Sequence, residues 1–170
     1  VMVFFMFVMG MNQGMQPIVG YNYGAEKFDR MFRCLWLTIA CATAILLVGW
    51  ALSMLFPQYI ARIFTTDETL LALSARGIKI DMLVFFVVGS QAAITHFFQS
   101  IGKVKVSIFL SLSRQLFLLL PMAYVFPLFW DLDGVWYSMP ASDFGSFAMT
   151  IPILIWYMNK LKAYGQKHNY

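Results

Sequence analysis

Long apolar segments dominate the chain, and short clusters of polar and charged residues separate them. Four of these segments each exceed the roughly 20 residues that cross a bilayer core about 30 Å thick. They cover residues 34–56, 80–101, 106–130 and 134–158, and residues 1–22 form a fifth, shorter segment. None alternates with the period of two that is typical of a membrane β-strand. The pattern therefore predicts five transmembrane α-helices, followed by a polar tail over residues 159–170 that we expect to be frayed.

Composition supports the membrane interpretation. Hydrophobic residues make up 61% of the 170 residues and charged residues only 12%, whereas a soluble domain is about a quarter charged. The chain is therefore predicted to be an all-α integral membrane protein. Cys34 and Cys41 lie seven residues apart on one predicted helix. This separation is too great for a disulfide, so both are expected to be reduced, packed thiols.

The first residue lies directly within an apolar run. Val1 is preceded by neither an initiator Met nor a basic leader, so a cleavable signal peptide does not fit. We expect the sequence to be a fragment of a longer chain, entered partway through a membrane helix.

Basic residues are distributed unevenly between the connecting segments. If the chain crosses at each apolar segment, eight basic residues lie on one side and three on the other. The eight are Lys27, Arg30, Arg33, Lys103, Lys105, Lys160, Lys162 and Lys167, and the three are Arg62, Arg76 and Lys79. Cytoplasmic segments carry the excess of Lys and Arg, so the C-terminus is predicted to be cytoplasmic. The net charge of +4 then needs no nucleic-acid partner.

The connection between the second and third apolar segments is the longest. Pro57 marks the end of the second helix. Thr65 and Glu68 have the spacing of a capping box, which predicts a short interfacial helix through residues 70–78. The alternative is a solvated loop in which this spacing occurs by chance.

Motifs typical of soluble enzymes are missing. The sequence contains no phosphate-binding glycine loop with its lysine, no HExxH and no CxxC, each of which would indicate a specific chemistry. We therefore predict neither an enzyme nor a metal site nor a bound cofactor.

Two charged residues are predicted deep within the membrane. Arg114 lies about 13 Å from the cytoplasmic end of its helix, and Asp143 lies about 17 Å from the same side. Their helices follow one another and should pack antiparallel, so the two charges reach similar depths. A charge in the hydrocarbon usually faces the bundle interior with a partner. We therefore predict a direct or water-bridged pair, which either stabilises the bundle or takes part in transport.

Uncharged polar side chains also lie within or near the membrane. Gln13, Gln16, Gln91 and Gln99 can hydrogen-bond between helices or line a wet cavity. We retain all four, with Arg114 and Asp143, as candidate cavity or coupling residues. His96 is expected to be a buried neutral imidazole, the alternative being a proton relay.

Residues 10–25, GMNQGMQPIVGYNYGA, end the first apolar segment with an unusual concentration of glycine and polar residues. Pro17 can bend the helix, and Gly20 and Gly24, four residues apart, permit close approach of a neighbouring helix. Glycine also permits the left-handed turn that ends a helix. We interpret the segment, including Tyr21 and Asn22, as a junction between two membrane helices.

Several motifs resemble the MATE (multidrug and toxic compound extrusion) transporters. Residues 16–25 followed by Arg30 resemble the signature that joins the second and third helices of that family's C-terminal lobe. The resemblance continues in order along the chain, through residues 97–103, residues 113–115 with Pro121, and residues 134–136 with Pro140 and Asp143. Residues 16–25 look most like the DinF-like bacterial branch.

The resemblance implies a twelve-helix transporter of two six-helix lobes that exports organic cations in exchange for sodium or protons. Residues 1–158 would then be a partial C-terminal lobe with five of its six helices. The implied partners are membrane lipid, the missing N-terminal lobe with the preceding helix, and small organic cations or drugs. The implied location is the bacterial cytoplasmic membrane. Residues 88–92 are neutral where sodium-coupled members carry an acidic residue, so we assign no coupling ion to particular residues.

Two other functions remain open. One is a related lipid or polysaccharide flippase, which would show a basic cavity for anionic headgroups. The other is a non-transporting membrane scaffold. Five helices without an opposing lobe cannot enclose a two-lobed cavity, so we predict that the 170-residue chain alone does not transport.

Overall fold

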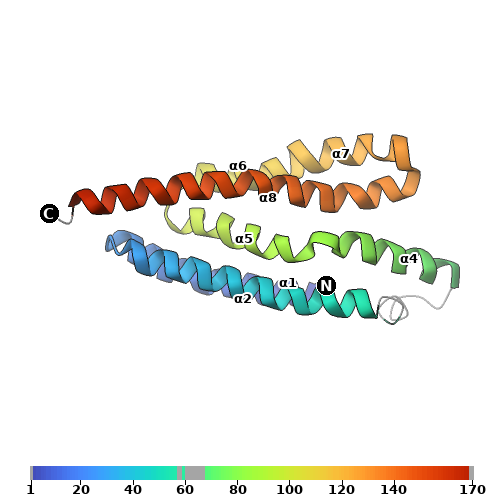
Figure 1. Ribbon diagram of the computed structural model, residues 1–170, viewed down its shortest axis with the longest axis horizontal. Coiled ribbons are helices and arrows are strands. Elements are labelled where there is room, and N and C mark those ends of the chain that lie inside the picture. Colours follow the sequence, from blue (N-terminus) through green and yellow to red (C-terminus); the bar gives the residue numbers. More distant parts are fainter. Residues whose placement is uncertain (1, 57–58, 60–67, 169–170) are drawn as a thin grey trace.

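The computed structural model describes residues 2–56, 59 and 68–168. Long helices run side by side along the long axis of the molecule (Figure 1). In chain order the elements are α1 (Met2–Gly24), α2 (Phe28–Leu55), α4 (Glu68–Asp81), η1 (Met82–Val84), α5 (Phe85–Ser100), α6 (Val104–Leu112), η2 (Ser113–Leu119), α7 (Leu120–Val125) and α8 (Pro127–His168). Element η1 is a 3₁₀ turn and η2 is a π-helix. Every regular element in the described ranges is helical, which confirms the predicted all-α class.

Three stretches of the described chain are long and apolar enough to cross a membrane. They are Phe28–Leu55, Arg76–Ser100 and Val104–Trp130, and they coincide with three of the five predicted crossings. Helix α1, with 23 residues, is about 34 Å long at 1.5 Å per residue. The crossings by α1 and α8 remain predictions.

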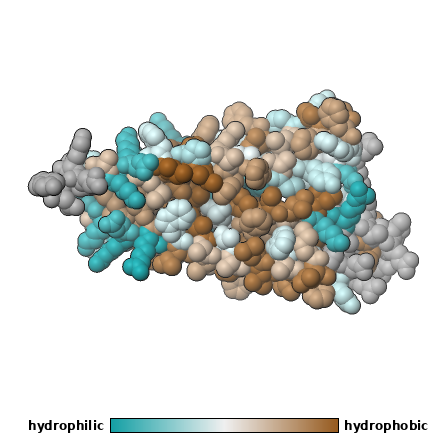
Figure 2. Space-filling view, in the orientation of Figure 1, coloured by the Kyte–Doolittle hydropathy of each residue, from teal (hydrophilic) through white to brown (hydrophobic). Residues whose placement is uncertain are grey.

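The core lies where α1, α2, α5 and α8 meet. Phe97 and Phe98 on α5 are fully buried, and the ring of Phe98 packs edge-to-face on Tyr157 of α8 at 5.4 Å. A second, smaller cluster is centred on Val8 and Leu46. Large apolar side chains also cover much of the outer surface (Figure 2). An apolar surface around a packed helical core is expected of a protein whose surroundings are lipid.

Helix α2 begins at Phe28, six residues before the predicted start at residue 34. Asp29 lies in its first turn, where a carboxylate is favourable because it faces the positive end of the helix dipole. The predicted segment 80–101 is divided among three elements. Its first residues belong to α4, which ends at Asp81, and η1 then separates α4 from α5. The predicted helix over residues 70–78 is present within α4. Its proposed cap, Thr65, and Pro57 lie outside the described residues.

The sequence places the reversal between the last two predicted helices at residues 130–134. The elements α7, which ends at Val125, and α8, which begins at Pro127, divide earlier, because Pro127 has no backbone N–H to continue the hydrogen bonding of α7. The apolar stretch nevertheless continues to Trp130, the predicted limit of this crossing. The chain then folds back (Figure 1). A Cβ on Gly134 would lie only 2.4 Å from the Phe126 carbonyl oxygen, so this reversal leaves no room for a side chain.

The prediction of a frayed tail after residue 158 was also wrong, because α8 continues to His168. Leu161 is 8% exposed and packs in the core cluster with Leu154 and Tyr157. The Lys160 ammonium lies 5.2 Å from the centre of the Trp156 ring. The residues after 158 are mostly polar, but Leu161 continues the buried apolar stripe that Leu154 and Tyr157 form in the membrane segment.

The junction between α1 and α2 has the predicted position but a different turn. Helix α1 continues through Pro17 to Gly24, and the residue with left-handed backbone is Glu26, with φ of 56°, rather than a glycine. The turn is closed by the Lys27 amide, which donates to the Asn22 carbonyl at 2.9 Å. The left-handed turn therefore comes two residues later than a glycine terminator at Gly24 would place it.

Only one of the two junction glycines makes a close approach. A Cβ on Gly20 would lie 3.3 Å from the Ser100 carbonyl oxygen, whereas nothing lies within 4 Å of one on Gly24. Tyr21 is 75% exposed, and Asn22 Nδ2 donates to the Ile18 carbonyl of its own helix at 2.8 Å. The expectation of close packing is thus confirmed at Gly20 and wrong at Gly24.

Candidate functional site

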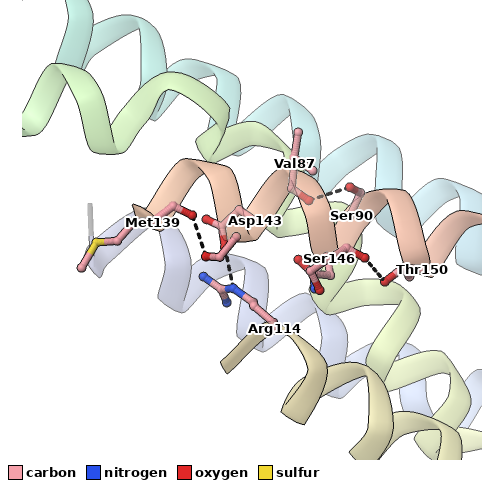
Figure 3. A network of polar contacts seen from close by, with 9 residues as sticks. Val87, Ser90, Arg114, Met139, Asp143, Ser146 and Thr150 are labelled. Carbon is pink, nitrogen blue, oxygen red and sulfur yellow. Dashed lines mark hydrogen bonds and ion pairs between the residues drawn. The ribbon is translucent and has the colours of Figure 1, made fainter. Parts of the chain in front are cut away.

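Arg114 and Asp143 form a direct ion pair between η2 and α8. Arg114 Nε lies 2.5 Å from Asp143 Oδ1, and the two side chains point toward one another (Figure 3). The Asp143 side chain is 10% exposed and that of Arg114 is 40% exposed. The predicted proximity of the two charges is confirmed.

Arg114 lies within a stretch of π-helix, Ser113–Leu119. Pro121 follows two residues later and cannot donate a backbone hydrogen bond. Its ring also conflicts with the carbonyl group four residues earlier in a regular α-helix, and that carbonyl belongs to Phe117, within η2. A widened turn relieves this conflict and rotates the side chains that precede it. Such π-turns occur frequently at functional sites.

Small hydroxyl residues line the buried face of α8. They recur every fourth residue, as Ser138, Ser142, Ser146 and Thr150, and all four are buried. Three of them donate to carbonyl groups of their own helix, at 2.6 to 2.8 Å. Their small size permits close helix packing. Ser146 differs from the other three because its hydroxyl accepts a hydrogen bond from another helix.

Gln91 on α5 is the donor to that hydroxyl. Its Nε2 hydrogen-bonds to Ser146 Oγ, one turn along α8 from Asp143. Gln91 is 5% exposed, and within the described part of the chain its Oε1 is buried without a hydrogen-bond partner. A buried acceptor in this state costs about 1–3 kcal/mol. The arrangement therefore holds one unsatisfied acceptor about one helical turn from the partly buried ion pair of Arg114 and Asp143.

A second polar cluster joins α1 to α5 nearer the α1–α2 junction. Gln16 Nε2 lies 3.0 Å from His96 Nδ1, and His96 Nδ1 also lies 3.1 Å from Gln99 Oε1. His96 was expected to be buried but is only partly so. Gln16 and Gln99 therefore meet at one imidazole, whereas Gln13 is exposed on α1 and lies apart from both polar clusters.

Sequence reasoning did not select two buried features. Asn12 is fully buried, and among the described residues neither of its side-chain polar atoms has a partner. The available signal was helical spacing. Asn12 lies four residues after Val8 and three before Met15, which are both buried, so it shares their face of α1. The sequence also shows a serine or threonine at every fourth position of α8 from Ser138 to Thr150. Serine is common at helix contacts, so this pattern alone did not indicate a site.

Another ion pair lies at the opposite end of the bundle from the C-terminus. Arg76 on α4 pairs with Asp133 near the start of α8, and their side chains are 63% and 27% exposed. Within the described residues, no three His, Cys, Asp or Glu side chains gather into a metal-ligand cluster.

The family model named MatE matches residues 1–125. This chain belongs to the MatE family. A curated relative, the multidrug export protein MepA of Staphylococcus haemolyticus (strain JCSC1435), is 22% identical over 132 residues, which cover 78% of this chain and 29% of that protein. The MatE chain is thus a member of a transporter family, and family members of this kind are multi-pass membrane proteins.

Solved structures of MATE transporters share this fold. The MATE multidrug transporter DinF-BH is 38% identical, with a TM-score of 0.85 over 91% of this chain and 34% of its own. An inward-facing MATE transporter of the MOP superfamily is 21% identical, with a TM-score of 0.89 over 95% of this chain and 38% of its own. An outward-facing form gives a TM-score of 0.85 at 21% identity, over 92% of this chain and 36% of its own. The MatE chain spans about a third of the length of these relatives, which agrees with the expected partial lobe.

Proposed function

We propose that this MatE chain forms five helices of the C-terminal lobe of a secondary active exporter of organic cations. The observation that carries the proposal is the likeness to DinF-BH, a multidrug transporter, at 38% identity over 91% of this chain. The exporter works by alternating access, in which one lobe rocks against the other around a central cavity. The missing partners are the N-terminal lobe and the helix before α1.

The Arg114–Asp143 pair is the proposed point at which a coupling cation acts on this lobe. Asp143 is the deeply placed carboxylate, and it holds α8 to η2 through Arg114. Binding of a proton to that carboxylate removes its charge and the attraction to the guanidinium. The contact between the two helices then weakens, and the π-helical turn around Arg114 is free to rearrange. Protonation and helix packing are linked in this way through one side-chain contact.

A cationic cargo would act on the same carboxylate. Because Asp143 is already paired, an organic cation gains its attraction only by displacing Arg114. Gln91 Oε1 supplies a neutral acceptor nearby. A proton and a cationic cargo therefore compete for one carboxylate, and antiport requires this competition between coupling ion and cargo. Sodium is the less favoured coupling ion in this lobe, because residues 88–92 carry no acidic side chain.

We further propose the bacterial cytoplasmic membrane as the location, with the C-terminus in the cytoplasm. The basic segments support this orientation because two of them meet at one end, where Lys103 and Lys160 line the same pocket. Arg76 and Asp133 lie at the other end. An excess of Lys and Arg at one end is the usual mark of the cytoplasmic side.

Dye efflux tests the proposal. The complete gene that contains this chain is expressed in a bacterium that lacks its own drug exporters, and efflux of a cationic dye is followed by fluorescence. Collapse of the proton gradient should abolish efflux, whereas removal of sodium should leave most of it. Efflux that persists through both treatments would contradict a cation-coupled antiporter.

A further inference from the structure

A cavity of about 530 Å³ lies at the end of the bundle that carries the C-terminus. Its walls come from three separate parts of the chain. The α1–α2 junction supplies Tyr23, Glu26 and Phe28, the turn before α6 supplies Lys103, and the last turns of α8 supply Lys160. This volume falls within the range of about 300–1,000 Å³ that is usual for small-molecule sites. The cavity is far from the Arg114–Asp143 pair along α8 and shares no residue with it.

The position of the cavity matches the boundary of the membrane. The apolar stretches Phe28–Leu55 and Val104–Trp130 begin at its walls. Hydrophilic residues gather at the same end of the molecule, whereas the middle is largely apolar (Figure 2). The cavity therefore lies at the level where hydrocarbon is expected to give way to lipid headgroups.

Aromatic rings give the cavity a fixed shape. The ring of Phe28 lies edge-on to Tyr23 at 6.3 Å and to Tyr164 at 6.4 Å, which joins the junction to α8. Tyr157 and Leu161 are 7% and 8% exposed and continue into the core. Tyrosine is enriched at the headgroup level because its ring is apolar and its hydroxyl group is polar. The pocket is thus part of the packed fold rather than a gap between loose side chains.

Among the described residues, the charged side chains on the cavity wall are those of Glu26, Lys103 and Lys160. The backbone of Lys103 is held in the turn by its amide, which donates to the Phe98 carbonyl at 2.9 Å, next to Gly102 with φ of 74°. The Lys160 ammonium lies over the ring of Trp156, one helical turn earlier on α8. The excess of positive charge favours an anion, and Glu26 opposes it. Basic pockets between membrane helices are known to bind anionic headgroups.

We propose that this cavity binds the phosphodiester headgroup of an anionic membrane phospholipid. Lys103 and Lys160 interact with the phosphate, and the tyrosine-lined walls contact the glycerol and the first acyl carbons. A bound lipid would bridge the α1–α2 junction, the α5–α6 turn and α8. The proposal does not depend on what is transported, because none of these residues belongs to the site around Arg114.

Lipid binding to the purified protein in detergent micelles tests this site by native mass spectrometry. The probes are dimyristoyl phosphatidylglycerol, the matching phosphatidylcholine and inorganic phosphate. The pocket variant is Lys103→Gln with Lys160→Gln. Its matched control is Lys27→Gln with Lys105→Gln, which removes the same charge at the same end without altering the cavity wall. Far-UV circular dichroism establishes that each variant retains its helical content.

The pocket variant should weaken binding of phosphatidylglycerol by about tenfold or more, and the control by about twofold or less. Glu26→Gln should tighten it, because that change removes the opposing charge without emptying the pocket. Equal losses in the pocket and control variants would overturn the proposal in favour of diffuse attraction. Equal binding of phosphatidylcholine would overturn the anionic specificity. Displacement of the lipid by inorganic phosphate would show a site for free anions instead.

Discussion

The side-chain amide of Gln16 on α1 and Gln99 Oε1 on α5 both approach one nitrogen, Nδ1 of His96, at 3.0 and 3.1 Å. A neutral ring with its proton on Nε2 accepts from Gln16, whereas a proton on Nδ1 is donated to Gln99. With the amides oriented in this way, one protonation state cannot satisfy both. The tautomer of His96 thus decides whether this hydrogen bond between α1 and α5 forms, one residue before Pro17.

Gln16→Ala removes the contact between helices and should lower the free energy of unfolding by about 0.6 kcal/mol, the average for hydrogen bonds between membrane helices. Gln99→Ala is the matched control, because its contact with His96 lies within a single helix. Tryptophan fluorescence during unfolding in mixed micelles measures both. A larger loss for Gln99→Ala would show that the Nδ1–H tautomer prevails and that the tie to α1 is weak.

The two halves of the Arg114–Asp143 pair should not be equally sensitive to substitution. Arg114→Gln leaves a buried carboxylate without its partner, whereas Asp143→Asn leaves an arginine that is 40% exposed and can reach water. Breaking a fully buried pair costs about 3–5 kcal/mol. We expect less for Arg114→Gln, about 2 kcal/mol, because the arginine is partly solvated. Asp143→Asn should cost clearly less than that.

The same unfolding assay in mixed micelles gives this order, and the double variant Arg114→Gln with Asp143→Asn provides the control. It removes both charges and should recover part of the stability lost in Arg114→Gln alone. A double variant whose loss equals the sum of the two single losses would show that the two side chains do not interact.

The Arg114–Asp143 pair could be predicted because depth in the membrane follows from residue number. A helix rises about 1.5 Å per residue, so two charges on consecutive antiparallel helices can be compared before any fold is known. The contact of Gln91 with Ser146 could not be found in this way. Their meeting depends on the rotation of α5 against α8, which hydropathy does not define.

Helix ends and turns were predicted less well because composition and packing compete there. The tail beyond residue 158 reads as polar, but a single buried leucine, Leu161, keeps it packed on the core. The π-helical stretch around Arg114 also escaped sequence analysis. Pro121 indicated a disturbance, yet proline alone does not distinguish a kink from a widened turn.

The junction glycines supply a prediction with an internal control. A Cβ on Gly20 would lie 3.3 Å from the Ser100 carbonyl, whereas one on Gly24 would meet nothing within 4 Å. Gly20→Val places a branched side chain against backbone that cannot move away easily, and overpacking of this kind costs about 1–3 kcal/mol. Gly24→Val should cost little. The melting temperature in detergent compares the two, and equal losses would show that the α1–α5 approach is not tight.

The end of α8 should behave as packed helix rather than as a tail. Leu161 is 8% exposed within the core cluster, and Leu→Ala at a buried site costs about 2–5 kcal/mol. For a position near a helix end we expect about 2 kcal/mol from Leu161→Ala. Ile155→Ala is the matched control on the same helix, because Ile155 is 52% exposed and faces lipid or detergent in both the folded and the unfolded state.

Limited trypsin digestion adds a readout that distinguishes a packed helix from a frayed one. Lys160 and Lys162 are both exposed, so only the helical backbone protects the bonds that follow them. Protease requires local unfolding before it cleaves such bonds. The folded protein should therefore resist cleavage at both lysines, and Leu161→Ala should accelerate it because the last turns lose their contact with the core. Rapid cleavage of the unmodified protein at Lys160 would show that the helix ends near residue 158 in solution.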